Sequence, residues 1–247
     1  MELLIFNNQY FNWQITTNIQ AMIKECKDCS IRSKAVQTLS DEEFNFHSEN
    51  CAELELEPGE SIFKEGQLSS HIAYLKSGLA KINKRGVTGN NQILKIVQPS
   101  RYIGLQAILS NKVHQFSSSV IEKSTVCYVD ARSFRELIKR NANFAHELIL
   151  HMCEDEVSYF DRFVNVHQKQ INGKLADTLL FFSTKIAKSD KFTIPLSRTE
   201  IGALVCSTRE SVIRSLHEMS DSGIINVNGK HFEILNEDLL KSISSKG

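Results

Sequence analysis

The stretch Leu196–Gly223, LSRTEIGALVCSTRESVIRSLHEMSDSG, decides how this sequence is interpreted. A first helix is predicted to follow Ser197, because a serine N-cap with a glutamate three residues on forms a capping box. A tight turn at Cys206 comes next, and a second helix begins at Ser207 or Thr208, where a hydroxyl can accept a backbone amide. Two short helices joined in this way are typical of a helix-turn-helix, which lays its second helix in the major groove of DNA.

The second predicted helix has one apolar and one polar face. Val212, Leu216 and Met219 recur at i, i+4 and i+7, a stripe that can be buried against the first helix. The polar face carries arginines, whose forked donors match guanine, and a glutamate that can accept from cytosine. Any amphipathic helix has a polar face, however, and Glu210 could instead complete a capping box with Ser207. The candidate DNA contacts are Arg198, Ser207, Thr208, Arg209, Glu210, Ser211, Arg214, His217 and Lys230.

The segment after Gly223 predicts a β-hairpin. It reads IINVNGKHFEIL, two alternating runs around Asn228-Gly229. Asn-Gly between such runs favours a two-residue turn in which both central residues have positive φ. Helix, turn, helix and hairpin together indicate a winged helix, which supports DNA binding more strongly than the helix pair does alone.

The charge balance limits how the protein could hold DNA. The chain of 247 residues is long enough for two domains, and its formal net charge is zero. From residue 171 to residue 247, Lys and Arg number ten and Asp and Glu nine, a difference of +1. DNA affinity must therefore depend on a few placed cations, helix N-termini and a doubled site rather than on bulk charge.

Several broad classes of protein are disfavoured. The N-terminal MELLIFNNQYFNW lacks the basic region of a secretory signal, and no apolar run approaches the roughly 20 residues of a membrane helix, so we expect a cytoplasmic protein with no membrane partner. In that compartment the six cysteines are thiols or ligands rather than structural disulfides. The sequence has no Walker A loop, dinucleotide glycine fingerprint or G-x-S-x-G elbow, so it is predicted not to be an enzyme.

Short alternating runs begin at Cys51 and continue to Asp130. Seven of them are separated by turn residues: AELELE, SIFKEG, HIAYLKSG, LAKINKR, QILKIVQ, FSSSVIEK and STVCYVD. Strands of this length at near-regular spacing indicate a small antiparallel barrel or sandwich. We assign residues 1–130 to an N-terminal segment and this β-domain.

A long helix is predicted to follow. After a short helix in SFRELIKR, Asn141 or Asn143 can cap a helix that runs to about Gln168. Its apolar seam can pack on the β-domain or on a second copy of the chain; we favour a homodimer, which presents two recognition helices about one DNA turn apart. Residues 131–170 then form the dimerisation region, and residues 171–247 the DNA-binding domain. The seam consists of Phe144, Leu148, Met152, Tyr159, Phe163 and Val166.

Together these features resemble the Crp/Fnr family of bacterial transcription regulators. The most specific stretches are GLQAIL at residues 104–109, INGKLADTLLFF, and LSRTEIGALVCSTRESVIRSL. The resemblance implies an α+β fold: an N-terminal antiparallel β-roll like a cyclic-nucleotide-binding domain, a long dimerisation helix and a C-terminal winged helix-turn-helix. It also implies a homodimer that regulates transcription at a palindromic DNA site and contacts RNA polymerase.

The second helix matches the family's recognition pattern. That pattern is Arg-Glu-x-x-x-Arg, and Arg209, Glu210 and Arg214 fit it. The resemblance implies that these three residues read half-sites like TGTGA or TTGA. Ile213 replaces the small or hydroxyl residue that some members place before the second arginine, which leaves the flanking base preference open.

The effector of the β-domain is unknown from the sequence, and cyclic AMP does not fit. The resemblance implies that a cyclic AMP site would use a Gly-Glu pair for the ribose and an Arg-Ser or Arg-Thr pair for the phosphate. An ionised phosphate needs such a cation or a nest of amides. Leucine follows the glycine here, and no arginine stands at Ser117. An effector pocket in this region would involve Gly104, Leu105, Ser117 and Ser118.

An iron–sulfur cluster is a second hypothesis for the signal. Cys26, Cys29 and the distant Cys127 resemble ligands of the oxygen-sensing cluster in the Fnr branch, to which the sequence is closer than to the cyclic AMP branch. The family's third cysteine would fall at Ala35, which cannot ligate iron. Cys51, or the aspartate that precedes Cys29, would have to replace it.

Further alternatives stay open. Cys26 and Cys29 could form a redox-active dithiol, or the regulator could respond to another small ligand or to none. Cys127 would then be a buried strand residue. An adaptor that binds protein through a cyclic-nucleotide-like β-roll is the alternative of another class, but it would need neither the exposed arginines nor a wing.

Overall fold

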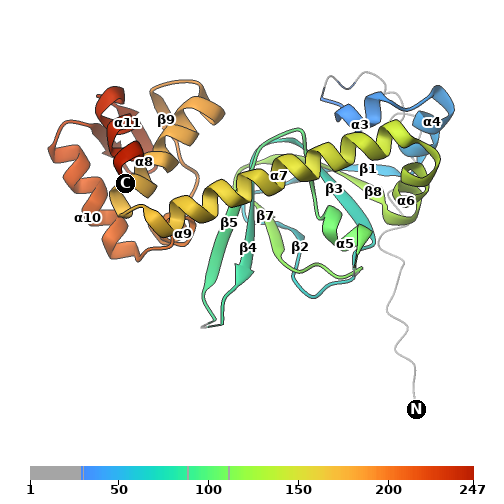
Figure 1. Ribbon diagram of the computed structural model, residues 1–247, viewed down its shortest axis with the longest axis horizontal. Coiled ribbons are helices and arrows are strands. Elements are labelled where there is room, and N and C mark those ends of the chain that lie inside the picture. The colour runs from blue at the N-terminus through green and yellow to red at the C-terminus, as the bar shows by residue number, and fades with distance from the viewer. Residues whose placement is uncertain (1–28, 30, 88, 111) are drawn as a thin grey trace, which may run out of the picture.

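A computed structural model of the chain describes residues 29, 31–87, 89–110 and 112–247. It consists of a β-roll, a long helix α7 (Ala142–Gln168) that lies alongside the roll, and a winged helix-turn-helix beyond the C-terminal end of that helix (Figure 1). The predicted fold class is therefore confirmed. The predicted N-terminal segment up to residue 28, with Cys26, lies outside the described residues.

The β-roll is built from two antiparallel four-stranded sheets. Its strands are β1 (Cys51–Leu56), β2 (Ser61–Phe63), β3 (His71–Ser77), β4 (Ala80–Arg85), β5 (Asn91–Val97), β6 (Arg101–Ile103), β7 (Ser117–Val120) and β8 (Ser124–Asp130). One sheet has the order β1-β8-β3-β6 and the other β2-β7-β4-β5. Alternate apolar side chains, such as Leu75, Ile82 and Val126, form the core between them.

Strand β6 was not among the seven predicted strands. It is three residues long and pairs with β3, where Tyr102 lies opposite Tyr74. Ser100, which lies between Pro99 and β6, has a positive φ of 66°. A strand this short shows no alternation of its own, so only its pairing with β3 defines it.

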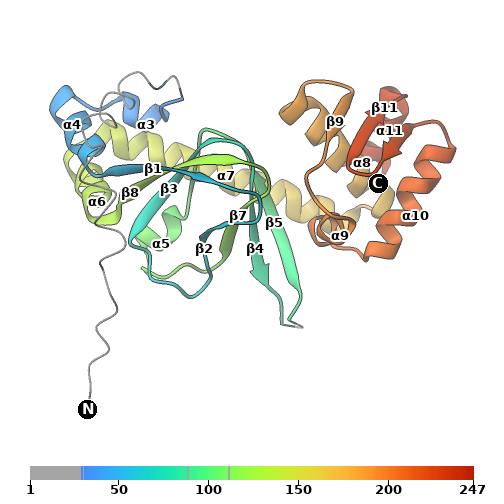
Figure 2. The same cartoon turned by 180° about the vertical axis from the view of Figure 1, so that it is seen from behind.

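Four helices flank the β-roll: α3 (Lys34–Gln37), α4 (Asp41–Glu49), α5 (Leu105–Leu109) and α6 (Ala131–Arg140). Ser40 and Glu43 cap α4 in a capping box. Helices α3 and α4 lie at the end of the roll that is farthest from the winged helix (Figure 2). They cover a second core on the outer face of the β1-β8-β3-β6 sheet, which includes Phe44, Ile72 and Phe134.

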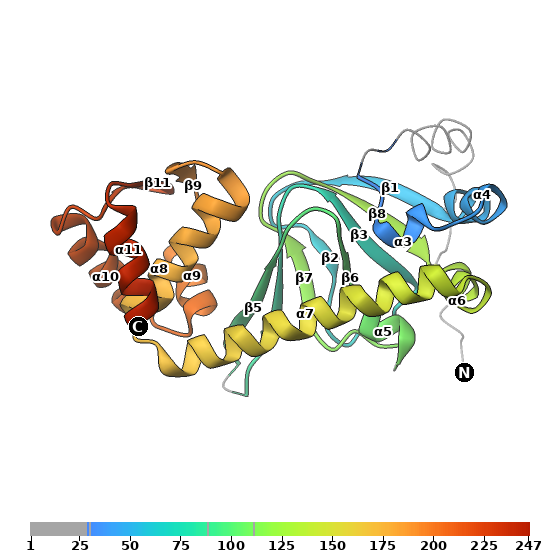
Figure 3. The ribbon, with the colours of Figure 1, turned by 45° about the horizontal axis from the view of Figure 1, so that its top comes forward.

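Helix α7 runs along one side of the roll to the winged helix (Figure 3). Asn141 caps it by accepting from the Phe144 amide at 2.9 Å. Phe144 and Leu148 are buried against the roll, as one interpretation of the seam predicted. No helix in the described part of the chain combines the length and the apolar run required to cross a membrane.

The predicted seam is only partly right, because α7 has a second apolar face. The large apolar residues exposed on α7 are Ile149, Leu150, Val157, Phe160, Phe163 and Val164, of which the predicted seam contained only Phe163. One face, which includes Phe144 and Leu148 near the N-terminal end of α7, packs on the chain's own β-roll. The other face is exposed and carries a row of residues at alternating spacings of three and four positions. We call this row the α7 stripe; it consists of Leu150, Cys153, Val157, Phe160 and Val164.

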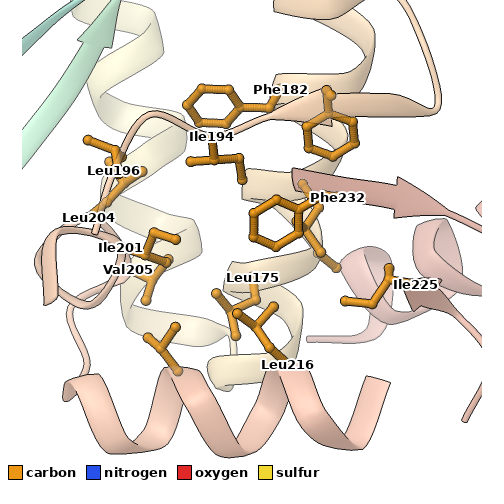
Figure 4. Packing of buried hydrophobic residues seen from close by; sticks show 14 of the residues in the cluster. Leu175, Phe182, Ile194, Leu196, Ile201, Leu204, Val205, Leu216, Ile225 and Phe232 are labelled. Atoms are coloured by element: carbon orange, nitrogen blue, oxygen red, sulfur yellow. The ribbon is translucent and has the colours of Figure 1, made fainter. Parts of the chain in front are cut away.

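The C-terminal part is a winged helix-turn-helix around its own core. It contains α8 (Ile171–Phe181), the π-helical turn η1 (Phe182–Ala187), β9 (Lys191–Thr193), α9 (Arg198–Val205), α10 (Arg209–Asp221), β10 (Ile225–Asn228), β11 (His231–Ile234) and α11 (Glu237–Lys246). The sheet order is β10-β11-β9. Leu175, Ile201, Leu216 and Phe232 converge in the core from α8, α9, α10 and the wing (Figure 4).

The wing turn differs by one residue from the predicted one. Asn228 pairs with His231 as the last residue of β10, so the two central residues are Gly229 and Lys230. Gly229 has a φ of 59°. A glycine at the first central position suits a type II′ turn, which needs positive φ only there, and this places Lys230 at the tip of the wing.

Candidate nucleic-acid interface

The turn between α9 and α10 depends on a close backbone approach. Ser197 accepts from the Glu200 amide at 3.2 Å, and the Glu200 carboxylate accepts from the Ser197 amide at 2.8 Å, which is the predicted capping box. Cys206 ends α9 with a φ of 54°. A Cβ atom on Gly202 would lie 2.8 Å from the Ser207 carbonyl oxygen. Glycine at position 202 therefore allows the turn to fold against α9.

Helix α10 begins at Arg209, with Thr208 as its N-cap. The Thr208 hydroxyl accepts from the Ser211 amide at 3.1 Å, which decides between the two predicted starting points. The alternative that Glu210 completes a capping box with Ser207 does not hold, because Ser211 is the capped position. The Glu210 side chain is instead 76% exposed, and its carboxylate lies 3.8 Å from the Arg209 guanidinium.

The two faces of α10 are separated as predicted. Val212, Leu216 and Met219 are buried in the core of the winged helix. The buried Ser215 hydroxyl donates to the side-chain carbonyl of Asn172 in α8. The exposed candidate contacts on and before α10 are Thr208, Arg209, Glu210, Arg214 and His217, whereas Ser207 and Ser211 are half-buried.

The two candidate cations outside α10 have different surroundings. Arg198 donates to the Gly229 carbonyl at 2.6 Å, and its guanidinium lies 5.0 Å from the centre of the Phe232 ring. Burial lowers the pKa of Arg198 from its ordinary value. Arg198 therefore holds the wing against α9, while the Lys230 side chain at the wing tip is exposed.

The winged helix is docked on the β-roll through α9. A continuous core joins Leu79, Ile93 and Ile96 of the roll to the winged-helix residues. Polar contacts surround it: Lys81 pairs with Glu200, Gln92 donates to the Ala203 carbonyl and to Cys206 Sγ, and Arg162 of α7 donates to the carbonyls of Ile93 and Leu204. A cleft of about 790 Å³ lies beside this contact, with Lys81 and Asn83 on one side and Thr208 and Arg209 on the other. Sequence analysis missed this docking, because it joins residues more than 40 positions apart.

Two family models match the chain on either side of α7. The cyclic nucleotide-binding domain matches residues 53–141, and the Crp-like helix-turn-helix domain matches residues 173–243. The fumarate and nitrate reduction regulatory protein of Escherichia coli (strain K12) is 24% identical over 226 residues, which cover 89% of this chain and 90% of that protein. The chain belongs to the Crp/Fnr family. It is a DNA-binding transcriptional regulator, as the sequence predicted.

Solved structures with the same fold come from other bacteria. FixK2 from Bradyrhizobium japonicum is 21% identical with a TM-score of 0.71, and the match covers 78% of this chain and 96% of that one. A CRP-family transcriptional regulator from Thermus thermophilus is 18% identical with a TM-score of 0.67, and the match covers 78% and 96%. These likenesses concern the architecture of the Crp/Fnr fold.

In this Crp/Fnr regulator the region predicted to hold an effector is filled by aromatic rings. Gly104 is the N-cap of α5 with a φ of 92°, and a Cβ atom there would lie 3.2 Å from both His114 and Phe63. The Phe63 and His114 rings are stacked with their centroids 3.7 Å apart. Leu105, the next predicted residue, is buried.

The two predicted effector serines already take part in hydrogen bonds. The Ser117 hydroxyl accepts from the Glu65 amide at 2.9 Å. The fully buried Ser118 hydroxyl donates to the Lys81 carbonyl at 3.1 Å. An effector site at Gly104, Leu105, Ser117 and Ser118 therefore stays a prediction.

A small cavity brings three cysteines of the regulator together on the outer face of the β1-β8-β3-β6 sheet. Cys29, Cys51 and Cys127 line this cavity, of about 50 Å³, together with His47; we call it the cysteine cavity. Cys26 lies outside the described residues. In the ranges that are described, no three His, Cys, Asp or Glu side chains converge on a position for a single metal ion.

Two tyrosines hold the segment after Cys29 on this sheet. The Tyr74 hydroxyl donates to the Ile31 carbonyl at 2.8 Å, and the Tyr102 hydroxyl lies 2.7 Å from the Ser33 hydroxyl. Tyr102 also contacts α7, because its ring meets the His151 ring edge-on with centroids 5.8 Å apart. The cysteine cavity therefore adjoins the long helix that leads to the winged helix.

His47 is a residue of the cysteine cavity that sequence analysis did not single out. It lies on α4 and is 7% exposed, and neither ring nitrogen has a hydrogen-bond partner among the described residues. Burial lowers the pKa of His47 to about 4, so the ring is neutral at physiological pH. Its sequence neighbours show no zinc-binding spacing, so only the fold reveals its position.

Proposed function

We propose that this regulator binds a palindromic DNA site as a homodimer, with α10 in the major groove of each half-site. The observation that carries the proposal is the separation of α10 into a face buried in the winged-helix core and a face that exposes Arg209, Glu210 and Arg214. Arginine suits bidentate contact with guanine, and glutamate can accept from cytosine. Ser207, Thr208, Ser211 and His217 lie around them as candidate phosphate contacts.

The wing supplies a second contact in this proposal. Lys230 at the wing tip is exposed and can meet a phosphate beside the recognition helix. Arg198 acts as a positioning residue, since its guanidinium donates to Gly229 within the wing turn. Residues 171–247 form the DNA-binding domain, residues 131–170 the dimerisation region, and residues 1–130 the N-terminal segment and signal-receiving β-roll.

The α7 stripe supports the homodimer. Its residues follow alternating spacings of three and four, the pattern by which two helices pack along a shared seam. Val157 and Phe160 are 58% and 61% exposed in the single chain. A symmetric pair of α7 helices would cover this apolar surface and double the number of DNA contacts, which matters for a chain with no excess of positive charge. We further propose that the dimer contacts RNA polymerase. We also propose that it acts in the cytoplasm.

Selection of DNA sites from a random pool tests the recognition helix. The Arg214→Ala variant is expected to lose about 1–3 kcal/mol of specific binding and to relax the preference at one base pair in each half-site. Lys241→Ala is the matched control, because it removes an exposed cation from α11 of the same domain. If Arg214→Ala selects the same sequence with the same affinity as the wild type, the assignment of α10 is wrong.

For the signal, the cysteine cavity favours an iron–sulfur cluster. Cys29, Cys51 and Cys127 line one cavity, and they are the residues that would hold such a group, because cysteine thiolates are its usual ligands. When bound, the cluster would supply a response to oxygen. Tyr102 and the segment after Cys29 connect the cavity to α7, so a change in this segment would reach the dimerisation helix.

Anaerobic incubation of the purified protein with iron and sulfide tests the cluster. A broad visible absorbance that air bleaches is the expected result, together with measured iron and sulfide in the protein. A colourless protein without bound iron would overturn the cluster and leave a dithiol switch, another small ligand or no effector as the alternatives.

A further inference from the structure

Another cleft, of about 370 Å³, lies where α7 passes from the β-roll to the winged helix (Figure 3). We call it the α7 cleft. All three parts of the chain line it, for example through Lys95 of the roll, Arg162 of α7 and Lys174 of the winged helix. Clefts of roughly 300–1,000 Å³ between structural units are the usual sites of small ligands. None of the lining residues belongs to the α7 stripe, so a dimer formed through the stripe does not use them.

The charges that line the α7 cleft are mostly neutralised within the chain. Three ion pairs do this: Lys95 with Asp155, Arg101 with Glu154, and Lys169 with Asp177. In the described part of the chain, two lining cations, Arg162 and Lys174, have no carboxylate within ion-pair distance. The exposed Asp161 is the lining carboxylate that has no cation there. The charge left over in the α7 cleft is therefore positive.

The Arg162 guanidinium has donors to spare. Among the described residues its hydrogen bonds are made by Nη2 alone, to the Ile93 carbonyl at 3.1 Å and to the Leu204 carbonyl. A guanidinium has five N–H groups, so the donors on Nε and Nη1 are left for other acceptors. Burial lowers the pKa of Arg162, but arginine stays charged. A partly desolvated guanidinium is best compensated by an anion that accepts from its planar fork, such as a phosphate.

Lys174 and Asn165 add two donors beside this guanidinium. Lys174 is half-buried on α8, and its ammonium has no hydrogen-bond partner among the described residues. Asn165 follows Arg162 by three residues on α7, so the two side chains share a face of that helix. An anion in the α7 cleft would therefore meet donors from both α7 and α8.

Asp161 limits what the rest of such an anion can be. A carboxylate repels a second phosphate, whereas it accepts hydrogen bonds from hydroxyl groups. We infer that the α7 cleft binds a small phosphorylated compound rich in hydroxyl groups, with Arg162 and Lys174 on its phosphate and Asp161 on its hydroxyls. The chemical class is that of a sugar phosphate.

A compound bound in the α7 cleft would bridge the roll, α7 and the winged helix. It would bind the docked arrangement better than an undocked one and so shift the population toward it. The docked arrangement holds the recognition helices in place, so the compound is expected to strengthen DNA binding. This last step rests on the proposed DNA-binding function, whereas binding of the compound itself does not.

Isothermal titration in phosphate-free buffer tests the site with glucose 6-phosphate, ribose 5-phosphate and glycerol 3-phosphate. Each is compared with its unphosphorylated parent and with inorganic phosphate. At least one phosphorylated probe is expected to bind ~10-fold more tightly than its parent and than inorganic phosphate, because both charged and hydroxyl contacts are made. The same probe is expected to raise the affinity for a labelled palindrome by about 5-fold, as fluorescence anisotropy measures it.

Three variants assign the contacts, and circular dichroism checks that each is folded. Lys174→Gln is expected to weaken the phosphorylated probe by about 10-fold. Asp161→Asn is expected to weaken that probe but not inorganic phosphate. Lys185→Gln is the matched control, because it removes an exposed cation from η1 that does not line the α7 cleft. Arg162 is left in place, since its bonds to Ile93 and Leu204 also hold the docking.

The outcomes separate the site from its effect on DNA. Absence of saturable heat with all three phosphorylated probes overturns the inference, and so does a Lys174→Gln protein that binds like the wild type. Inorganic phosphate that binds as tightly as every probe overturns the contact with hydroxyl groups. Binding without any change in DNA affinity overturns the regulatory step. A wild-type protein that binds no palindrome overturns the proposed function, while calorimetry still decides the α7 cleft.

Discussion

Lys81 on β4 forms an ion pair with Glu200, the residue that completes the capping box of α9. One carboxylate thus holds the first helix of the helix-turn-helix and ties it to the β-roll. Both side chains are partly buried, with exposed fractions of 20% and 34%. The position of the recognition helix relative to α7 therefore depends in part on this ion pair. Substitution of Lys81 removes the ion pair and leaves the capping box of α9 in place.

Removal of the Lys81 ammonium is expected to weaken specific DNA binding without changing the preferred sequence. Lys81→Ala leaves the capping box intact but loosens the docking of α9, so the two helices of a dimer would be less well preorganised for one palindrome. A partly exposed pair of this kind supports a loss of about 2- to 5-fold in affinity. Fluorescence anisotropy with a labelled palindrome measures it. The control is Lys84→Ala on the same strand, whose ion pair with Glu65 stays within the roll; equal losses in both variants would contradict this role of docking.

The same carboxylate predicts a pH dependence of stability. Burial alone would raise the pKa of Glu200, but hydrogen bonds from Lys81 and Ser197 hold that pKa below its ordinary value of 4.5. A group whose folded pKa is depressed stabilises the fold above its unfolded pKa and loses this contribution as pH falls through the folded value. The wild-type protein should therefore lose stability relative to Glu200→Gln as the pH decreases from about 5 to about 3, a range that includes the ordinary glutamate pKa and extends below it. Thermal unfolding of both proteins at each pH measures this difference. Parallel curves for the two proteins would show that Glu200 does not contribute.

The sequence predicted local features well because their causes are local. The capping box at Ser197 and the N-cap at Asn141 each depend on residues three positions apart. Strand β6 and the docking of α9 could not be predicted, because each is defined by a partner far away in the chain. Helix α11 did leave a signal that was missed, since Asn236 caps it and two acidic residues follow.

The candidate site divides in the same way. The exposed face of α10 was visible in the sequence, because amphipathic spacing is a property of the helix itself. The sequence offered Cys51 as a possible ligand beside Cys127, but it did not predict His47 at the same cavity, because strand register and the packing of α4 bring these residues together. The predicted wing turn was one residue too early in the chain. Asn-Gly suits the two central positions of a hairpin turn, but a glycine at the first central position suits one as well, and the structure has Gly229 there.

Gly202 is expected to be intolerant of a larger side chain. A methyl group there would lie 2.8 Å from the Ser207 carbonyl oxygen, which belongs to the backbone of the turn and cannot simply rotate away. Gly202→Ala should destabilise the winged helix by about 1–3 kcal/mol, measured by denaturant unfolding. Thr199→Ala, an exposed change on the same helix, should stay within about 0.5 kcal/mol of the wild type. If Gly202→Ala unfolds with the same free energy as the wild type, the turn can accommodate a methyl group at position 202 and this explanation is wrong.

Cyclic AMP is expected neither to bind nor to change DNA affinity. The Ser117 and Ser118 hydroxyls are engaged by Glu65 and Lys81, and the space beside Gly104 is occupied by aromatic rings. A cyclic phosphate placed there would lose its hydration, and no arginine stands at position 117 to replace it. Isothermal titration of the nucleotide into the protein should give only heats of dilution. Saturable heat, or a shift in DNA affinity at millimolar nucleotide, would contradict this expectation.

The α7 stripe makes the oligomeric state testable by a single charge. Phe160 is 61% exposed in one chain, and in a symmetric pair of α7 helices it would face the same region of the partner. Phe160→Glu would place a carboxylate from each chain in an apolar seam, where unpaired charge is costly, so the dimer should dissociate. Sedimentation velocity at micromolar concentration should then give a monomer.

Ser158→Glu adds the same charge to an exposed position of α7 outside the stripe and should remain dimeric. Because only the dimer contacts both half-sites, Phe160→Glu should also lose the advantage of a palindrome over a single half-site while keeping the base preference of α10. If both variants sediment as dimers, the stripe is not the seam, and the spacing of the two recognition helices must be fixed by another surface.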